Sequence, residues 1–257
     1  MFKYAIVRRP SHSLIDGISQ TPEMGKPDYD LALQQHDRYV EILRECGLEV
    51  TVLEANEDYP DSVFIEDNAL CTPRGVAILS RPGAESRRGE ANLPDLREAL
   101  ARYYDDIEQV VEPGTTDPGD IMMVGDHYYI GLSGRTNQAA VDQITAILEK
   151  HGMTAETVPV TGILHLKDDV VYLDNNNLIV AKAYENHPAF ANFNKLVVDD
   201  DEYYAVNSLW INGKVIVPEG FPKIEQKIRD CGYEVILINT SEFEKITGSL
   251  TCMSLRF

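Results

Sequence analysis

A cysteine, a histidine and several carboxylates stand at matching points of the chain, each shortly before a strand-like segment. Cys252 lies in GSLTC and His165 in GILHLKDD, while Asp61 lies in PDSVFIED and Asp117 in TTDPGD. Successive intervals along this series are 56, 48 and 87 positions, which fits a unit of about 50 residues. A thiolate can attack an electrophilic carbon, a histidine can serve as acid and base, and carboxylates can hold a guanidinium. These residue types therefore suggest thiolate chemistry on a cationic substrate.

Each of these residue types also has a purely structural interpretation. Cys46 and Cys231 lie in the last turn of expected helices and Cys71 in an expected strand, where a thiol fills core space. His165 differs, because two leucines flank it at the start of an apolar strand. The carboxylates of PDSVFIED lie beside apolar residues, and a buried carboxylate needs a cationic or hydrogen-bonding partner. The other histidines show no partner pattern and are expected to be structural or solvated: His12, His36, His127, His151 and His187.

Amphipathic segments that end in glycine give the first sign of a repeated unit. Residues 32–47, 138–152 and 222–232 each carry an apolar stripe at helical spacing, close with a glycine and run into a short apolar segment. Glycine commonly follows the last turn of a helix because it adopts the left-handed conformation readily. Each segment is therefore expected to be a helix followed by a strand.

Four strand–turn–strand segments are also expected. Residues 208–217 turn at Asn-Gly, the strongest short hairpin signal, and residues 121–132 turn at Gly-Asp. Residues 69–81 and 170–181 turn around Pro-Arg-Gly and around three asparagines, and residues 93–104 are expected to form a helix after the first of these. A hairpin, a helix and a strand thus recur about every 50 residues, which suggests modules stacked around an axis.

The two ends of the chain complete the count of modules. The N-terminal part supplies a strand, a helix and a second strand but lacks one strand of its hairpin, whereas LTCMSLRF at 250–257 supplies a lone strand. Pairing this strand with FKYAIVR, residues 2–8, would close a ring and bring the segments before the hairpins to its axis. The expected fold is therefore α/β, a propeller of five pseudo-symmetric modules. An open two-domain α/β protein is the alternative.

Composition limits the classes of partner. The net charge of −19 argues against a nucleic-acid surface, which needs clustered Lys and Arg. No apolar run is long enough to span a membrane and no signal-peptide pattern occurs, so we expect a cytoplasmic protein with no membrane partner. The four cysteines include no Cys-x-x-Cys pair, so free thiols are expected rather than a zinc site or a disulfide framework. Exposed helix faces permit a monomer or a homodimer.

The chain resembles the dimethylarginine dimethylaminohydrolase family of the guanidino-group-modifying enzyme superfamily in five motifs: PDSVFIED, SRPGAESRRGE, DPGDIMMVGDHYYIGLSGRTN, LHLKDD and LTCMSLRF. The resemblance runs from Met1 to Phe257 and implies a single catalytic domain over residues 1–257 with the five-module α/β propeller, or pentein, fold. It also implies hydrolysis of N-omega-methylated arginines, as dimethylarginine and monomethylarginine, to citrulline and dimethylamine or methylamine. No metal or organic cofactor is implied.

The resemblance also assigns roles to residues that match the motifs. It implies that Cys252 is the nucleophile, His165 the general acid and base, and Asp117 the carboxylate that orients the histidine. Arg87 and Arg135 match arginines that hold the carboxylate of the free amino acid. Further matches are positions expected to bind the substrate through side-chain or main-chain groups: Ile18 in an N-terminal lid-like loop, Asp61, Phe64, Glu66, Asp67 and Ile246.

Three positions depart from the family pattern. Many bacterial members carry Glu where Asp117 stands, Pro118 replaces a small residue, and Thr247 stands where Asp is frequent. These departures leave the chemistry intact and the preferred methylarginine open. Two other functions also stay open, namely a sibling enzyme such as a deiminase acting on arginine or a related free guanidino amino acid, and a non-catalytic protein that captures a cationic amino acid. Deiminases usually contain a helical insertion for which 257 residues leave no room.

Overall fold

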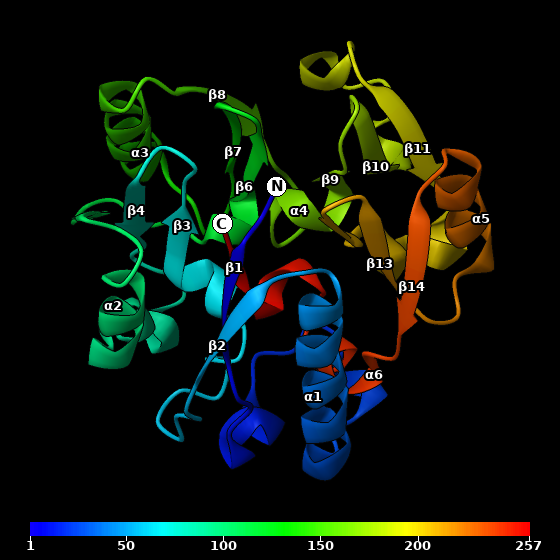
Figure 1. The fold of residues 1–257 in the computed structure, drawn as a ribbon, viewed down its shortest axis with the longest axis horizontal. Helices are drawn as coiled ribbons and strands as arrows, with labels where there is room; N and C mark the ends of the chain where they lie inside the picture. Colours follow the sequence, from blue (N-terminus) through cyan, green and yellow to red (C-terminus); the bar gives the residue numbers. More distant parts are fainter.

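A computed structural model describes residues 1–257 and contains five three-stranded sheets set around a central axis (Figure 1). In each sheet an inner strand pairs antiparallel with a middle strand, which pairs parallel with an outer strand. This arrangement confirms the expected five-module propeller over the open two-domain alternative. From inner to outer strand the sheets are β15 (Leu255–Arg256), β1 (Tyr4–Arg8) and β2 (Glu49–Leu53); β3 (Ala69–Cys71), β4 (Val76–Leu79) and β5 (Asp106–Gln109); β6 (Ile121–Val124), β7 (His127–Leu132) and β8 (Thr154–Pro159); β9 (Val170–Tyr172), β10 (Asn177–Ala181) and β11 (Asn194–Val198); and β12 (Leu209–Ile211), β13 (Lys214–Pro218) and β14 (Glu234–Ile238).

The hairpins form where the turn residues predict them. Asn212 and Gly213 join β12 to β13 with φ values of 51° and 92°, the left-handed pair that an Asn-Gly turn favours. Asn175 and Asn176, between β9 and β10, also have positive φ. Tight turns thus keep four of the inner strands next to their middle strands, whereas β15 pairs with β1 from the other end of the chain.

Helices connect the middle strands to the outer strands in most modules. The amphipathic segments expected at 32–47, 138–152 and 222–232 are confirmed as helices, and Asp28 and Asn137 cap the first two by accepting the amides of Leu31 and Ala140. The α-helices are α1 (Tyr29–Glu45), α2 (Pro94–Leu100), α3 (Gln138–Lys150), α4 (Leu166–Asp169), α5 (Pro222–Asp230) and α6 (Ser241–Glu244). The 3₁₀ turns are η1 (His12–Asp16), η2 (Pro22–Met24), η3 (Ile65–Asn68), η4 (Glu85–Arg87), η5 (Glu90–Asn92), η6 (Pro118–Asp120), η7 (Lys182–Tyr184), η8 (Pro188–Phe190), η9 (Asp200–Val206) and η10 (Thr251–Met253).

Three details differ from the sequence-based expectation. The helix expected over 93–104 ends at Leu100. The module of β9 to β11 has no α-helix between β10 and β11, because its connection is short and forms only η7 and η8. Cys231 is exposed rather than part of the core, whereas Cys46, at the equivalent position directly after α1, packs into the largest apolar cluster.

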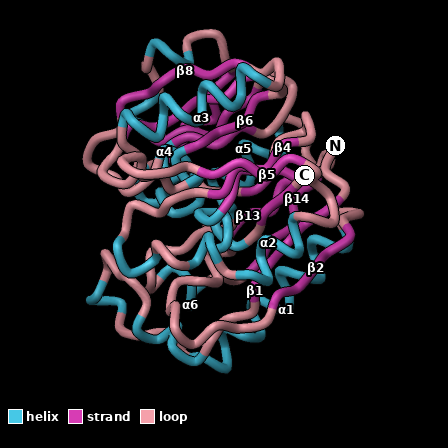
Figure 2. The backbone as a smooth tube through the Cα atoms, turned by 90° about the vertical axis from the view of Figure 1, so that its left-hand side faces the viewer, coloured by secondary structure: helices cyan, strands magenta, loops and turns pink.

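Strand β15 closes the ring against β1, as the sequence predicts. Ala5 pairs with Arg256 and Ile6 with Leu255, and the carbonyl oxygen of Phe257 accepts the amides of Lys3 and Tyr4, both at 2.8 Å. Figure 1 accordingly shows both chain ends near the centre of the molecule. The side view in Figure 2 places both ends toward one face of the ring and α6 toward the other.

Apolar side chains fill the spaces between neighbouring sheets and helices. The largest cluster joins α1 to the first and last modules, and it includes Phe64, Ile246 and Cys252. The core of the fold therefore extends up to the residues expected to carry the chemistry. None of the helices combines the length and the apolar composition needed to cross a membrane.

Removing residues 253–257 is expected to lower the free energy of unfolding by at least about 4 kcal/mol, because Met253 and Leu255 are buried large apolar residues and the pairing with β1 is lost. Thermal and urea unfolding followed by circular dichroism measure this change. A variant that lacks only the exposed Met1 is the control. A truncated protein as stable as the full chain would contradict the closing role of β15.

Candidate active site

The residues expected to do the chemistry meet in one small cavity. Cys252, His165 and Asp117 line a space of about 30 Å³, well below the roughly 300–1,000 Å³ usual for small-molecule sites. Leu164, which the sequence-based prediction missed although it adjoins His165, lines the cavity with Thr247. All of the expected substrate-binding residues except Glu66 also line it: Ile18, Asp61, Phe64, Asp67, Arg87, Arg135 and Ile246.

Single helical turns set these side chains at the axis. Asp67 lies in η3, Asp117 directly before η6, His165 directly before α4 and Cys252 in η10. Each of these turns directly precedes, or lies one residue before, an inner strand. The four chemical groups thus occupy equivalent places in four modules, which explains the regular spacing in the sequence.

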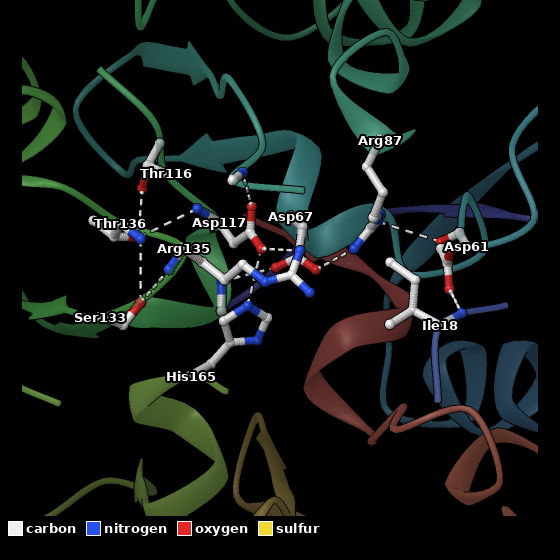
Figure 3. Close-up of polar contacts among 12 residues, drawn as sticks. Ile18, Asp61, Asp67, Arg87, Thr116, Asp117, Ser133, Arg135, Thr136 and His165 are labelled. Atoms are coloured by element: carbon white, nitrogen blue, oxygen red, sulfur yellow. Dashed lines mark hydrogen bonds and ion pairs between the residues drawn. The ribbon is translucent and has the colours of Figure 1, made fainter. Parts of the chain in front are cut away.

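His165 is held by a carboxylate and by a close approach of the backbone. Its Nε2 lies 3.1 Å from Oδ2 of Asp117, whose Oδ1 accepts the amide of Gly83 at 2.8 Å (Figure 3). A Cβ at Gly119 would lie 2.5 Å from Nδ1 of His165, so only glycine leaves room for the imidazole. The ring is therefore fixed in orientation, as a proton donor and acceptor requires.

Negative charge around His165 keeps it protonated at neutral pH. Burial alone would lower the pKa of its imidazole, but the charges of Asp67, Asp117 and Asp120 together raise the pKa to about 10. In return, His165 and Arg87 hold the pKa of the buried Asp67 below its usual value, against the effect of burial. The site thus contains an imidazolium able to give a proton to a leaving group.

The guanidinium of Arg87 links the segment that carries Asp67 to Glu90. Its Nη1 donates to Oδ2 of Asp67 at 2.7 Å, and its Nη2 donates to the carbonyl oxygen of Phe64 at 2.9 Å. Glu90 accepts two further bonds from the same guanidinium, at 2.9 and 2.8 Å. Most of its donors are thus engaged by the protein, so Arg87 orders the carboxylates of the cavity in this state. Arg135 lies on the other side, 3.9 Å from Asp117 (Figure 3).

A loop between η1 and η2 closes over the cavity. The amide of Ile18 donates to Oδ1 of Asp61 at 2.9 Å, and the hydroxyl of Ser19 donates to the carbonyl oxygen of Lys245 at 2.7 Å. The amide of Gln20 donates to Oγ1 of Thr247 at 2.8 Å. We call residues 17–21 the lid. Three hydrogen bonds hold the lid shut, and its closure explains why the cavity is so small.

Cys252 sits in this cavity as a largely buried thiol, 6% exposed. Burial is the first cause that raises the pKa of its thiol, followed by the negative charges of Glu66, Asp67 and Asp168. A thiol in this setting stays protonated at neutral pH until a positive charge arrives beside it. These surroundings are therefore suited to a nucleophile that a cationic ligand activates.

Glu66 is the expected substrate-binding residue that the structure does not place in the cavity. Its carboxylate points to the opposite side of the turn and pairs with Lys167 at 2.6 Å and with Arg256 at 2.7 Å. Both cations and Glu66 line a second, larger cavity of about 490 Å³, which residues of all five inner strands enclose. The ion pairs therefore lie at the boundary between the axial cavity and the small one.

One group of side chains has the spacing of metal ligands. Ligand atoms of Asp67, Asp117 and His165 all lie within 4.8 Å of one another. A metal needs a neutral imidazole, whereas the pKa of His165 is raised to about 10, and Arg87 already engages Asp67. The chemistry of this donor set fits an ion-pair network better than a metal centre.

A five-module α/β propeller whose axial turns hold a cysteine, a histidine and carboxylates defines the pentein class of proteins. A crystal structure of an enzyme from Pseudomonas aeruginosa, a mutant of dimethylarginine dimethylaminohydrolase in complex with citrulline, superimposes with a TM-score of 0.97 at 47% identity and covers all of both chains. A second structure of a dimethylarginine dimethylaminohydrolase, an adduct with S-methyl-L-thiocitrulline, also gives a TM-score of 0.97 at 47% identity over all of both chains.

Sequence comparison leads to the same family. The family model for N,N dimethylarginine dimethylhydrolase of the eukaryotic type matches residues 19–218. The N(G),N(G)-dimethylarginine dimethylaminohydrolase of Pseudomonas aeruginosa is 48% identical over all of both chains, and that of Streptomyces coelicolor is 39% identical over 99% of this chain and 96% of its own. The chain belongs to the dimethylarginine dimethylaminohydrolase family.

The raised pKa of His165 has a measurable consequence for pH dependence. Because its pKa rises from the ordinary 6.5 to about 10 in the fold, its contribution to stability is complete below pH 6.5 and is lost as the pH rises through 10. Nitrogen-15 NMR of the imidazoles should show His165 charged at pH 8, with Asp117→Asn lowering its pKa. The buried His36, whose pKa burial lowers to about 4, is an internal control that stays neutral. Titration of His165 near pH 6.5 would contradict the ion-pair network.

Loosening the lid should expose the thiol. Thr247→Val keeps the side-chain shape but removes the acceptor for the amide of Gln20, so the lid should open more often. The rate of Cys252 alkylation by iodoacetamide, followed by mass spectrometry of the tryptic peptide, should rise severalfold, because one hydrogen bond contributes about 1 kcal/mol. Thr145→Val on α3, far from the lid, should leave the rate unchanged. An unchanged rate in Thr247→Val would mean that this bond does not hold the lid.

Proposed function

We propose that this protein hydrolyses N-omega-methylated L-arginines to citrulline and dimethylamine or methylamine, with Cys252 as the nucleophile. The observation that carries the proposal is the meeting of Cys252, His165 and several carboxylates in one closed cavity. Membership of the dimethylarginine dimethylaminohydrolase family supports the same reaction, since full-length relatives at 48% and 39% identity bear that name. Residues 1–257 would act as one catalytic domain that binds a small molecule, as a monomer or a homodimer.

Carboxylates in the cavity match a cationic substrate. Asp67 and Asp61 line it, and the guanidinium of a methylarginine can form paired hydrogen bonds with such groups. Arg135 at the rim, and Arg87 once the substrate is bound, would face the carboxylate of the amino acid. The carbonyl oxygens of Ile18 and Ile246, and the ring of Phe64, would complete the contacts. The net negative charge of the protein agrees with this preference for a cation.

Catalysis would proceed through a covalent intermediate. A bound guanidinium next to the thiol favours the thiolate, which attacks the guanidinium carbon and forms a carbon–sulfur bond. Protonated His165 gives its proton to the leaving nitrogen as the carbon–nitrogen bond breaks, and an S-alkylthiouronium adduct remains. Neutral His165 then takes a proton from water as the water adds to the adduct carbon. The carbon–sulfur bond breaks, and citrulline and the thiol are released.

Asp117 supports both halves of this cycle. Its contact with Nε2 holds the imidazole in place, and its charge favours the imidazolium that starts the reaction. A shorter side chain than the glutamate of many relatives must lie closer to the histidine to do this. The distance of 3.1 Å shows that it reaches.

Substrate profiling separates this proposal from its nearest alternative. We expect dimethylamine from asymmetric dimethylarginine and methylamine from monomethylarginine, each in equal amount with citrulline, and far less product from unmethylated arginine. Ammonia release from arginine as the fastest reaction would instead identify a sibling deiminase. A protein that binds these amino acids without releasing any amine would be the non-catalytic alternative.

Two substitutions test the roles of the proposed catalytic residues. Cys252→Ser should fold normally and give no product, because a hydroxyl is far less acidic than a thiol. His165→Gly should lower kcat by at least roughly a hundredfold yet still allow some adduct to form, because thiolate attack itself does not need the imidazole, whereas fast protonation of the leaving nitrogen and activation of water do. Steady-state amine release and intact-protein mass spectrometry measure both effects. Full turnover in either variant would refute the assigned role.

A further inference from the structure

Glu66 is buried between two cations directly behind the turn that carries Cys252. Its Oε1 accepts from Nζ of Lys167 at 2.6 Å and from Nη2 of Arg256 at 2.7 Å. Its Oε2 accepts the hydroxyl of Thr251 at 2.9 Å. Since Glu66 does not line the cavity that holds Cys252, it contacts the residues around the thiol rather than a substrate. The groups that Glu66 holds in place therefore bear on the position of the thiol.

Arg256 forms hydrogen bonds to the turn that carries the thiol. Its Nη1 lies within hydrogen-bonding distance of the carbonyl oxygens of Thr251 at 2.9 Å and of Ser254 at 2.7 Å, and 2.8 Å from Oγ of Ser254. These acceptors flank Cys252 on both sides. A guanidinium presents its donors in one rigid plane, so it holds several acceptors at once in a way that a lysine ammonium does not reproduce.

Tyr39 of α1 supports the same turn from the other direction. Its hydroxyl donates to the carbonyl oxygen of Leu250 at 2.9 Å and lies 2.7 Å from Oγ of Ser254. Asn207 adds a further contact, since its Oδ1 accepts the amide of Thr251 at 3.0 Å, so side chains outside η10 help to fix it. The position of the Cys252 thiol therefore depends on Arg256 and Tyr39.

Arg256 also sets a largely buried positive charge near the thiol, which counters the negative charges of Glu66, Asp67 and Asp168 that, with burial, raise the pKa of Cys252. Lys167 and Arg256 share the single carboxylate of Glu66, and both are largely buried. Burial lowers the pKa of the Arg256 guanidinium, but the charge of Glu66 raises this pKa, and interaction with Cys252 raises it further. The negative charge of an ionised Cys252 stabilises the Arg256 cation, so the Arg256 cation stabilises the Cys252 thiolate to the same extent.

We propose that Arg256 is a positioning residue that holds the Cys252 turn in its reactive place and favours the thiolate, with Glu66 as its anchor. This rests on the proposed role of Cys252 as the nucleophile. Shape and charge make separate contributions. Replacement by lysine keeps the charge and removes the fork, whereas replacement by glutamine removes both.

Three variants test the proposal against a matched control. Arg256→Lys should lower kcat by at least about tenfold with KM changed less than about twofold, since charged hydrogen bonds to the turn are lost and substrate contacts are not. Arg256→Gln should lose at least as much. Thr251→Val, which removes only the bond to Glu66, should lose severalfold. The control Arg229→Lys lies on the exposed surface of α5 and should behave as the wild type.

A readout that does not depend on turnover separates positioning from loss of fold. The pH profile of Cys252 alkylation by iodoacetamide, measured peptide by peptide, should shift to higher pH in Arg256→Gln and stay near that of the wild type in Arg256→Lys. The kcat values are referred to the fraction of folded protein from circular dichroism. If Arg256→Gln does not fold, Arg256→Lys and Thr251→Val decide the question.

Some outcomes would overturn the proposal. Wild-type kcat in Arg256→Lys, or a loss that only follows the unfolded fraction, would leave no positioning role. An unshifted alkylation profile in folded Arg256→Gln would mean that the charge of Arg256 does not favour the Cys252 thiolate. A wild-type protein that releases no amine from methylarginines would instead refute the proposed function, while the alkylation profiles would still report on Arg256.

Discussion

The antiparallel pairing of β15 with β1 is the constraint on which the rest of the structure depends. It joins the last module to the first, and only a closed ring sends the starts of all inner strands to one axis. The turn with Cys252 ends one residue before β15, so the bonds that close the ring also help to fix the thiol. Arg256 performs both tasks, because its backbone pairs with Ala5 and its side chain holds the turn of Cys252.

The carboxylates that this acidic chain buries at the axis need cationic partners. Asp67 is paired with Arg87 and charge-matched by His165, and Glu66 is paired with Lys167 and Arg256. Burial of each ion costs several kcal/mol in desolvation. The ion pairs offset this cost, which would stay uncompensated for an unpaired group. The same pairs keep the imidazole charged and the thiol protonated until a cation enters. Stability and chemistry at the axis thus use the same charges.

Features set by local interactions were predictable from the sequence. The Asn212-Gly213 turn, the glycine-ended helices and the recurring offsets of Asp117, His165 and Cys252 led to the ring and to the chemical groups of the cavity. Its other expected residues, such as Arg87 and Arg135, followed only from the resemblance to the family. Side-chain direction within single turns was not predictable. Glu66 and Asp67 are adjacent in η3 yet face different cavities, and only tertiary contacts with Lys167 and Arg87 decide which faces which. The exposure of Cys231 likewise depends on tertiary packing, because Cys46 lies at the equivalent position after α1 and is buried.

The place of the nucleophile in the chain also has a consequence for biosynthesis. The strand that closes the ring and the thiol beside it are made after the other four modules, and the closing contact joins residues about as far apart in sequence as this chain allows. A nascent chain therefore lacks both the thiol of Cys252 and the strand that closes the ring until after the other modules have been made. Any chain released before Cys252 is made has neither a closed ring nor a nucleophile.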